Sequence, residues 1–241
     1  MKFFKKLFVF LIIIILIVLA ICSIIGYTTY NKALTEDSLN SRIDKITSKE
    51  HYTKFEDLSK TYVNAVVAAE DHRFYEHGAL DPIGICRAIW SNFKAKELQE
   101  GGSTITQQVA KNVVFSQDFS FERKLGEAFA AFDIEKSFTK SNILEIYVNT
   151  CYFGNGYYGI YDASYGYYKK SPKDLTLSEA SMLAGIPNAP SVYSPNVNPT
   201  LAKQRQKYVL NKMVRLWPTT YMNGGKTGLN LNLFFRYNTF S

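Results

Sequence analysis

A run of 19 residues without a charged side chain, Leu7 to Ile25, constrains this chain more than any other feature. At about 1.5 Å per residue, a helix of this length spans roughly 28 Å, close to the ~30 Å hydrocarbon core of a bilayer. Three of the first six residues are lysines, so the positive-inside rule places residues 1–6 in the cytoplasm and the rest of the chain outside. We therefore predict one transmembrane anchor over residues 7–25.

A cleaved signal peptide is the alternative for this segment. The apolar run is longer than the hydrophobic region of a typical signal peptide, and no Ala-x-Ala cleavage site follows it. A lipoprotein site fails as well, because Ile21 precedes Cys22 at a position that needs a small residue. We therefore expect an uncleaved anchor.

The charge balance favours an anionic partner. The chain carries 28 basic and 21 acidic residues, a formal net charge of +7, which suits nucleic acid, anionic lipid or a phosphorylated substrate. A protein tethered to a bilayer meets lipid phosphates first, so we expect membrane lipids and no nucleic acid. The spacing of Cys22, Cys86 and Cys151 is not typical of a metal site.

The chain after the anchor divides into three parts by composition. Residues 26–60 are mixed and polar and are predicted to form a linker or stalk. Residues 61–217 contain successive helical patterns and no convincing run of alternating strands, which predicts a mainly α-helical domain. Its last helix, from about 198 to 217, carries a basic face that we expect to be solvated. Residues 218–241 are rich in Asn, Gly and aromatic residues and remain unassigned.

Glu70 ends an apolar stretch over residues 63–69. A carboxyl group at the edge of an apolar wall has its ionised form destabilised by desolvation, so we expect the pKa of Glu70 to be raised. This is a setting for a general acid or base. A solvated acid at a helix end is the simpler interpretation of Glu70 alone, but neighbouring polar residues such as Asp71 and His77 favour the functional one.

Residues 101–111 place a Gly-Gly turn before a helix. Ser103 or Thr104 is predicted to cap this helix, and Ser103, Gln107 and Lys111 recur every four residues and share one face. Free N–H groups at the helix N-terminus, a hydroxyl, an amide and an ammonium group would suit phosphate or sugar hydroxyls. The alternative is a solvated helix face, which is less favoured because the two glycines let the backbone approach a ligand closely.

A longer helix is predicted to begin at Glu122 and to end near Ser137. Arg123 and Glu127 lie four residues apart on one face of this helix, where a structural ion pair is the simplest interpretation. The functional interpretation is a second carboxylate, held beside a cation and facing Glu70 across a cleft.

Five motifs in order make the chain resemble the peptidoglycan glycosyltransferases of family 51 in their stand-alone form. The resemblance covers about residues 60–215. The motifs are Glu70-Asp71-x-x-Phe74-x-x-His77, Gly102-Ser103-Thr104-Ile105-x-Gln107-Gln108-x-x-Lys111-Asn112, Arg123-Lys124-x-x-Glu127, the run from Ile143-Leu144-Glu145-x-Tyr147-x-Asn149 to Gly159, and Leu177-x-Glu179-Ala180 through Leu183-Ala184-Gly185-x-Pro187. No single motif suffices, but five in this order are highly specific.

The resemblance implies a lysozyme-like helical domain with a small membrane-proximal lobe, joined to one N-terminal transmembrane helix. It implies lipid II as substrate, a disaccharide-pentapeptide on undecaprenyl pyrophosphate. The implied reaction extends a β-1,4 glycan strand with inversion at the anomeric carbon and releases the lipid pyrophosphate. The enzyme would lie in the bacterial cytoplasmic membrane with its catalytic domain on the outer side, where the nascent glycan and other cell-wall synthesis proteins are its expected partners.

The resemblance also assigns roles to residues. Glu70 is implied to be the general base on the acceptor 4-hydroxyl, and Glu127 a second catalytic carboxylate that positions the basic side chains or a divalent ion. The residues implied to bind substrate are Asp71, His77, Ser103, Thr104, Gln107, Gln108, Lys111, Asn112, Arg123 and Lys124. A divalent cation, Mg²⁺ or Mn²⁺, would join at the substrate pyrophosphate, and no metal site made by protein ligands alone is expected.

Two departures from the family pattern leave alternatives open. The glycine after His77 is Gly78, one position early, and residues 117–119 supply no basic residue before the Arg-Lys pair. A catalytically silent cell-wall scaffold is therefore one alternative. A lysozyme-like lytic enzyme is the other, since it uses the same pair of carboxylates. The basic residues and the anchor speak against it, because polymerised wall glycan carries no pyrophosphate.

Overall fold

The computed structural model describes residues 2–95, 101–115 and 120–217, and these ranges contain helices and no strand. One isolated bridge pairs Tyr152 with Tyr158. The prediction of a mainly α-helical protein is confirmed. The helices are α1 (Lys2–Ala33), α2 (Leu39–Thr47), η1 (Phe55–Asp57), α3 (Lys60–Glu70), α4 (Pro82–Ala95), α5 (Ile105–Val114), α6 (Phe121–Ser137), α7 (Lys140–Thr150), α8 (Ile160–Tyr168), η2 (Pro172–Asp174), α9 (Leu177–Gly185), η3 (Ile186–Asn188), α10 (Pro190–Tyr193) and α11 (Pro199–Leu216).

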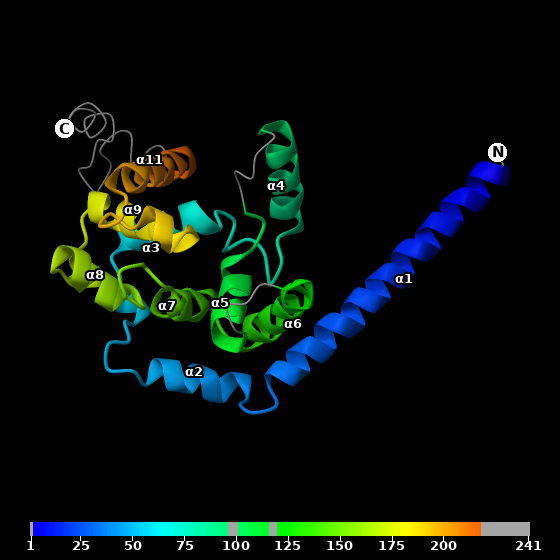
Figure 1. Ribbon diagram of the computed structural model, residues 1–241, viewed down its shortest axis with the longest axis horizontal. Helices are drawn as coiled ribbons and strands as arrows, with labels where there is room; N and C mark the ends of the chain where they lie inside the picture. The colour runs from blue at the N-terminus through cyan, green and yellow to red at the C-terminus, as the bar shows by residue number, and fades with distance from the viewer. Residues whose placement is uncertain (1, 96–100, 116–119, 218–241) are drawn as a thin grey trace.

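Helix α1 runs outward from the helical body, with the N-terminus at its far end (Figure 1). Among the described residues, α1 is the one helix that is long and apolar enough to cross a membrane, and none of its most apolar stretch is buried. The helix is longer than the predicted span, because it continues past Ile25 to Ala33.

The C-terminal part of α1 packs against α6. Gly26 makes this close approach possible, because a Cβ atom there would lie 2.8 Å from Cε2 of Phe129. The Tyr30 hydroxyl donates a hydrogen bond to Asp133 Oδ2 over 2.7 Å. The anchor is therefore docked on the helix that carries the predicted ion pair.

The predicted linker over residues 26–60 differs from the structure. This segment contains the docked end of α1 and also α2, whose Leu39 and Ile43 are buried in contact with α5 and α7. The Arg42 side chain donates from Nη2 to the carbonyl oxygen of Ala33 over 2.7 Å. The mean composition of the segment is polar, but a short helix needs only one apolar residue per turn to bury a stripe against a core.

The core of the body lies between α3, α5, α7 and α9. Each of these helices contributes a fully buried large side chain, namely Tyr62, Ile105, Tyr147 and Leu183. Helix α11 packs against both α3 and α9. Because α3 is enclosed by its neighbours, its C-terminal residue is held where the core meets the surface.

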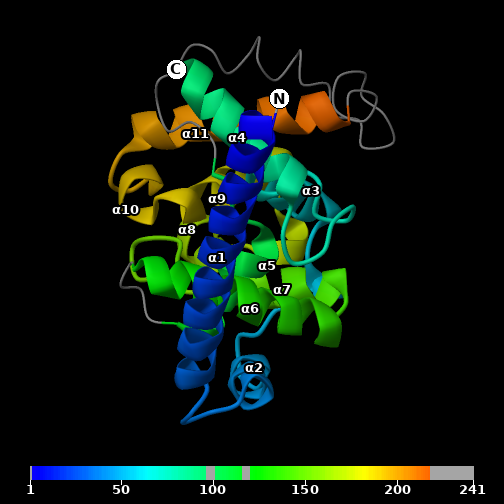
Figure 2. The same ribbon diagram turned by 90° about the vertical axis from the view of Figure 1, so that its right-hand side faces the viewer.

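Helix α4 stands on the same side of the body as α1 (Figures 1 and 2). Its large apolar side chains are unusually exposed, with values of 58% for Ile83, 65% for Ile89, 70% for Trp90 and 80% for Phe93. Large exposed apolar side chains gathered on one helix are typical of contact with a membrane or a partner.

Candidate active site

Glu70 is the last residue of α3, and the apolar residues before it pack into the core. Its side chain is 7% exposed. Oε2 accepts a hydrogen bond from Gln108 Nε2 over 2.9 Å, and Oε1 lies 3.7 Å from Arg205 Nη2 without a hydrogen bond. Burial raises the pKa of Glu70, while the Gln108 hydrogen bond and the charges of Arg205 and Lys111 oppose the rise.

Glu70 lines a pocket of about 270 Å³ between α3, α4, α5, α6 and α11. Basic side chains dominate this pocket, since five basic residues line it beside three acidic ones. The basic residues are Arg87, Lys111, Lys124, Arg205 and Lys212, and the acidic residues are Glu70, Asp71 and Glu127. The arrangement suits an anion that lies next to a carboxylate.

The α6 wall of the pocket is built from a compact set of ionised groups. Lys124 Nζ donates to Glu127 Oε2 over 2.6 Å and to Ser103 Oγ over 2.8 Å. Arg123 Nε lies 3.4 Å from Glu127 Oε1. Glu127 is 1% exposed, so the buried carboxylate fixes the positions of two cations at the wall, as the sequence predicted for the pair on this helix.

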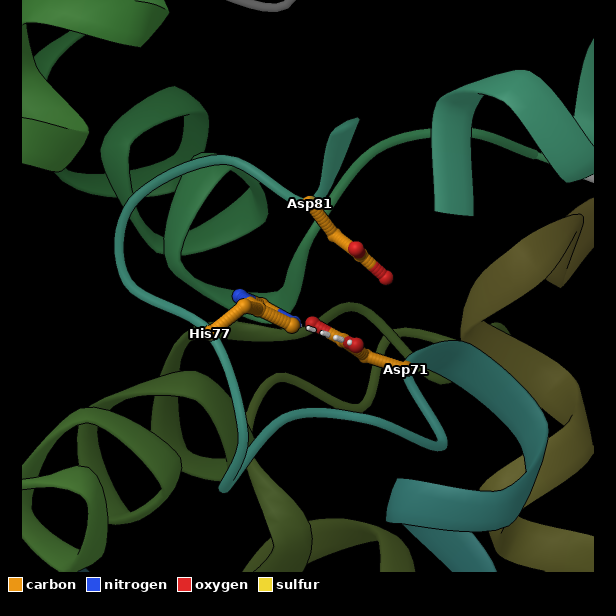
Figure 3. A group of neighbouring side chains, drawn as sticks. All are labelled: Asp71, His77 and Asp81. Atoms are coloured by element: carbon orange, nitrogen blue, oxygen red, sulfur yellow. Dashed lines mark hydrogen bonds and ion pairs between the residues drawn. The ribbon is translucent and has the colours of Figure 1, made fainter. Parts of the chain in front are cut away.

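The turn after α3 forms a hydrogen-bonded cluster with the N-terminus of α5 (Figure 3). His77 Nε2 lies 2.8 Å from Asp71 Oδ1, and its Nδ1 lies 2.7 Å from the carbonyl oxygen of Gly78. The other Asp71 oxygen accepts from the backbone N–H of Ile105 over 3.0 Å. Asp71, His77 and Asp81 bring ligand-type atoms within 4.8 Å of one another, but these hydrogen bonds already use both Asp71 oxygens and both His77 nitrogens.

The N-terminus of α5 differs from the prediction in one respect, because N–H groups that were expected to be free are bonded within the protein. Thr104 is the cap, and Thr104 and Gln107 form a capping box in which each side chain accepts from the backbone N–H of the other. Asp71 takes the Ile105 N–H. The N–H groups of Ile105 and Gln107 in the first turn are therefore satisfied within the protein, as orphan donors at a helix end next to a core need to be.

The structure brings most of the predicted site residues to one pocket. Eight of the twelve line it, namely Glu70, Asp71, Ser103, Gln107, Gln108, Lys111, Lys124 and Glu127. Four do not line it, and each has a structural contact. His77 bonds to Asp71, Thr104 caps α5, Asn112 donates weakly to Thr150 over 3.5 Å, and Arg123 pairs with Glu127.

Six polar residues of the pocket were not predicted from the sequence, namely His72, Arg87, Asn188, Arg205, Tyr208 and Lys212. Three of them share a face of α11. From the sequence alone, this face could not be distinguished from a basic helix face that is exposed to solvent. The spacing of residues 205, 208 and 212 by three and four was the available signal. Only the packing of α11 on α3 shows which face of that helix meets Glu70.

We expect His77→Leu to lower the melting temperature. The change leaves a buried carboxylate oxygen of Asp71 without its partner, which costs about 1–3 kcal/mol, or roughly 2–10 °C for a domain of this size. Thermal unfolding followed by circular dichroism measures it. His51→Leu is the control, because the His51 side chain is 54% exposed. Equal melting temperatures for the two variants would contradict a structural role for His77.

Two further expectations from the sequence lie outside the described residues. They are the missing basic residue at 117–119 and the tail over 218–241. The early glycine, Gly78, is within the described part, and its carbonyl oxygen bonds to His77.

Comparison with known proteins places this geometry in a family. A family profile described as Transglycosylase matches residues 38–214. Penicillin-binding protein 1A of Neisseria flavescens is 50% identical over 166 residues, which cover 69% of this chain and 21% of that protein. The same protein of Neisseria lactamica is 49% identical over 166 residues, with the same coverage.

A shorter relative matches over most of its length. A protein of Cupriavidus necator whose name proposes a transglycosylase is 45% identical over 177 residues, which cover 72% of this chain and 76% of that protein. The chain spans about a fifth of the penicillin-binding proteins that it matches. The profile covers well over half of the chain and includes every residue of the pocket. The chain therefore belongs to the transglycosylase family.

Proposed function

We propose that this protein is a membrane-anchored peptidoglycan glycosyltransferase that polymerises lipid II into β-1,4 glycan strands and releases undecaprenyl pyrophosphate. The family and the names of the relatives support the general class. One observation carries the specific proposal: a nearly buried carboxylate, Glu70, shares a pocket with Lys111, Lys124 and Arg205. A base next to fixed cations is what the transfer of a sugar from a pyrophosphate to a hydroxyl needs.

Glu70 is the proposed general base. The 4-hydroxyl of the acceptor sugar gives its proton to a Glu70 carboxylate oxygen, while the hydroxyl oxygen forms a bond to the anomeric carbon of the donor. Oε1 suits this role, because Gln108 already occupies Oε2 and Oε1 has no hydrogen bond. A pKa raised by burial also makes the carboxylate a stronger base for the incoming proton.

The basic side chains are proposed to bind the leaving pyrophosphate. The bond from the anomeric carbon to the phosphate oxygen breaks with its electron pair on that oxygen, which the ammonium groups of Lys111 and Lys124 stabilise. Ser103 and Glu127 hold Lys124 in place, so little reorganisation is needed as charge develops. Attack from the Glu70 side and departure on the cation side would invert the anomeric carbon.

A divalent cation is proposed to accompany the substrate. Glu127 is the carboxylate on the cationic wall, and it is already paired with Arg123 and Lys124, so it fits poorly as the centre of a metal cage. Mg²⁺ or Mn²⁺ would be held mainly by pyrophosphate oxygens and would neutralise part of their negative charge. Added Mg²⁺ should then leave the melting temperature of the protein without substrate unchanged. Chelation should slow the turnover of lipid II without changing that melting temperature.

The proposed location is the bacterial cytoplasmic membrane, with α1 as the anchor and the catalytic body outside. The lysines before the apolar run support this orientation. Helix α4, whose large apolar side chains are exposed, stands on the side of the body along which α1 extends (Figure 1), so we propose that these side chains rest in the outer leaflet, near the lipid chains of the substrate. Other cell-wall synthesis proteins are proposed partners.

Turnover of labelled lipid II by the detergent-solubilised protein tests the proposal. We expect glycan polymer, resolved by gel electrophoresis, and release of lipid pyrophosphate. Isolated wall glycan is the parallel substrate. Cleavage of wall glycan without polymer formation would replace the proposal with a lytic enzyme, and binding of lipid II without turnover would replace it with a scaffold.

A further inference from the structure

Arg205 of α11 lies next to the carboxylate of Glu70, the proposed base. Its Nη2 is 3.7 Å from Glu70 Oε1, and its side chain is only 12% exposed. The two residues are far apart in sequence and meet because α11 packs on α3. A guanidinium group with so little solvent contact acts on a neighbouring charge with little screening.

The guanidinium group is held from several sides. Its central carbon lies 4.6 Å from the ring centre of Tyr208 and 5.6 Å from that of Tyr193, and Nε donates weakly to the carbonyl oxygen of Gly185 over 3.4 Å. Gly185 also provides the space, because a Cβ atom there would lie 2.9 Å from Arg205 Cγ. The charge is therefore preorganised before any substrate binds.

The groups around Glu70 divide by charge. Lys111 of α5 is the other cation whose charge acts on it, and Asp71 is the opposing anion. The α6 wall adds Lys124 and Glu127 across the pocket. Behind Glu70, burial raises the pKa of three groups well above neutrality and keeps them uncharged, namely Tyr62, Tyr147 and Cys151.

We propose that Arg205 is a positioning residue that keeps Glu70 ionised, so that the carboxylate can accept the acceptor proton. This inference rests on the proposed function. At 3.7 Å the guanidinium group compensates the buried charge without forming a hydrogen bond to Oε1. That oxygen therefore keeps a lone pair for the substrate hydroxyl. Gln108 fixes the other oxygen, so charge and orientation come from two different residues.

Substitution of Arg205 tests the proposal through the pH profile. Loss of the positive charge removes one of the influences that lower the pKa of Glu70, so the acid limb of kcat should move to higher pH in Arg205→Gln. We expect kcat to fall about tenfold or more on the acid side, with recovery as the pH rises. Arg205→Lys should restore most of the profile. Lys207→Gln, an exposed position on the same helix, is the control for loss of charge.

Difference infrared spectroscopy provides a second readout that needs no turnover. The carboxyl stretch that disappears in Glu70→Gln reports protonated Glu70, and it should persist to higher pH in Arg205→Gln than in the wild type. Circular dichroism confirms that each variant is folded. Should Arg205→Gln fail to fold, Arg205→Lys and Arg205→Met supply the same comparison.

Two results would overturn the inference. One is an unchanged acid limb and carboxyl stretch in a folded Arg205→Gln protein. The other is a uniform rise in KM at every pH, which would make Arg205 a direct phosphate ligand. Failure of the proposed function is a separate result, because it would appear in the wild-type protein as no polymer from lipid II, while the infrared titration would still report on the pair.

Discussion

Glu70→Gln is expected to abolish glycan synthesis while the protein stays folded. The amide keeps the size of the side chain but cannot accept a proton at neutral pH, and general-base catalysis contributes about 10²–10⁴-fold to a rate. The loss should appear in kcat, because Lys111 and Lys124, which are proposed to bind pyrophosphate, are unchanged. Initial rates over a range of lipid II concentrations separate kcat from KM.

The same substitution should stabilise the protein at neutral pH. Burial raises the folded-state pKa of Glu70 above its unfolded value, so the folded state binds the proton more tightly. Its contribution to stability is therefore fully present at low pH and is lost as the pH rises through the folded-state pKa. The amide of the variant stays neutral, so its contribution to stability is not lost as the pH rises. The melting temperature of Glu70→Gln should exceed that of the wild type near pH 8, and the difference should shrink on acidification.

Glu76→Gln is the matched control, since Glu76 is an exposed acid shortly after Glu70 in the chain and does not line the pocket. It should retain the kcat of the wild type and the same dependence of melting temperature on pH. Wild-type turnover in Glu70→Gln would remove Glu70 as the base and would move attention to Glu127, the most deeply buried carboxylate of the pocket.

Glu127→Gln should have the largest effect on stability. The Glu127 carboxylate is 1% exposed and is paired with Arg123 and Lys124. Removal of one member of a buried ion pair costs about 3 kcal/mol, because the cation beside it keeps its charge in a poorly solvated place. For a domain of this size the melting temperature should fall by roughly 10 °C. Turnover should fall as well, since Lys124 loses its shortest contact.

Glu122→Gln on the same helix separates this effect from a general change of charge. Glu122 is exposed in the first turn of α6, where its interaction with the helix dipole is worth about 0.3–1 kcal/mol. Differential scanning calorimetry compares the two variants. A loss of stability in Glu127→Gln no larger than in Glu122→Gln would show that the ion pair contributes little to the fold.

Local sequence patterns were sufficient for most helices of the domain and for the positions of two of its carboxylates. Glu70 was placed at the end of an apolar helix from a few neighbouring residues, and the structure has α3 end there. The ion pair between Arg123 and Glu127 followed from a spacing of four residues. These features depend on contacts within one helix, whose geometry is known once the helix is known.

The same patterns said less about residues whose partners lie on other elements. Asp71 and His77 bond to each other, and Asp71 also bonds to the N-terminus of α5 while it lines the pocket, so their roles in binding substrate stay predictions. Residues 26–60 were expected to be a linker because their mean composition is polar. Polar side chains that satisfy backbone groups and polar side chains that face a ligand have the same composition, so the sequence could not separate them.

The sequence by itself determined the apolar anchor, the helical class and the position of a carboxylate at the end of an apolar helix, because periodicity and burial of apolar residues act over a few turns. Only the tertiary structure decided that α11 brings Arg205 to 3.7 Å from Glu70 and that α1 docks on α6. The physical reason is that an amphipathic helix specifies which of its faces is apolar. The arrangement of helices that buries all such faces together decides which polar side chains become neighbours.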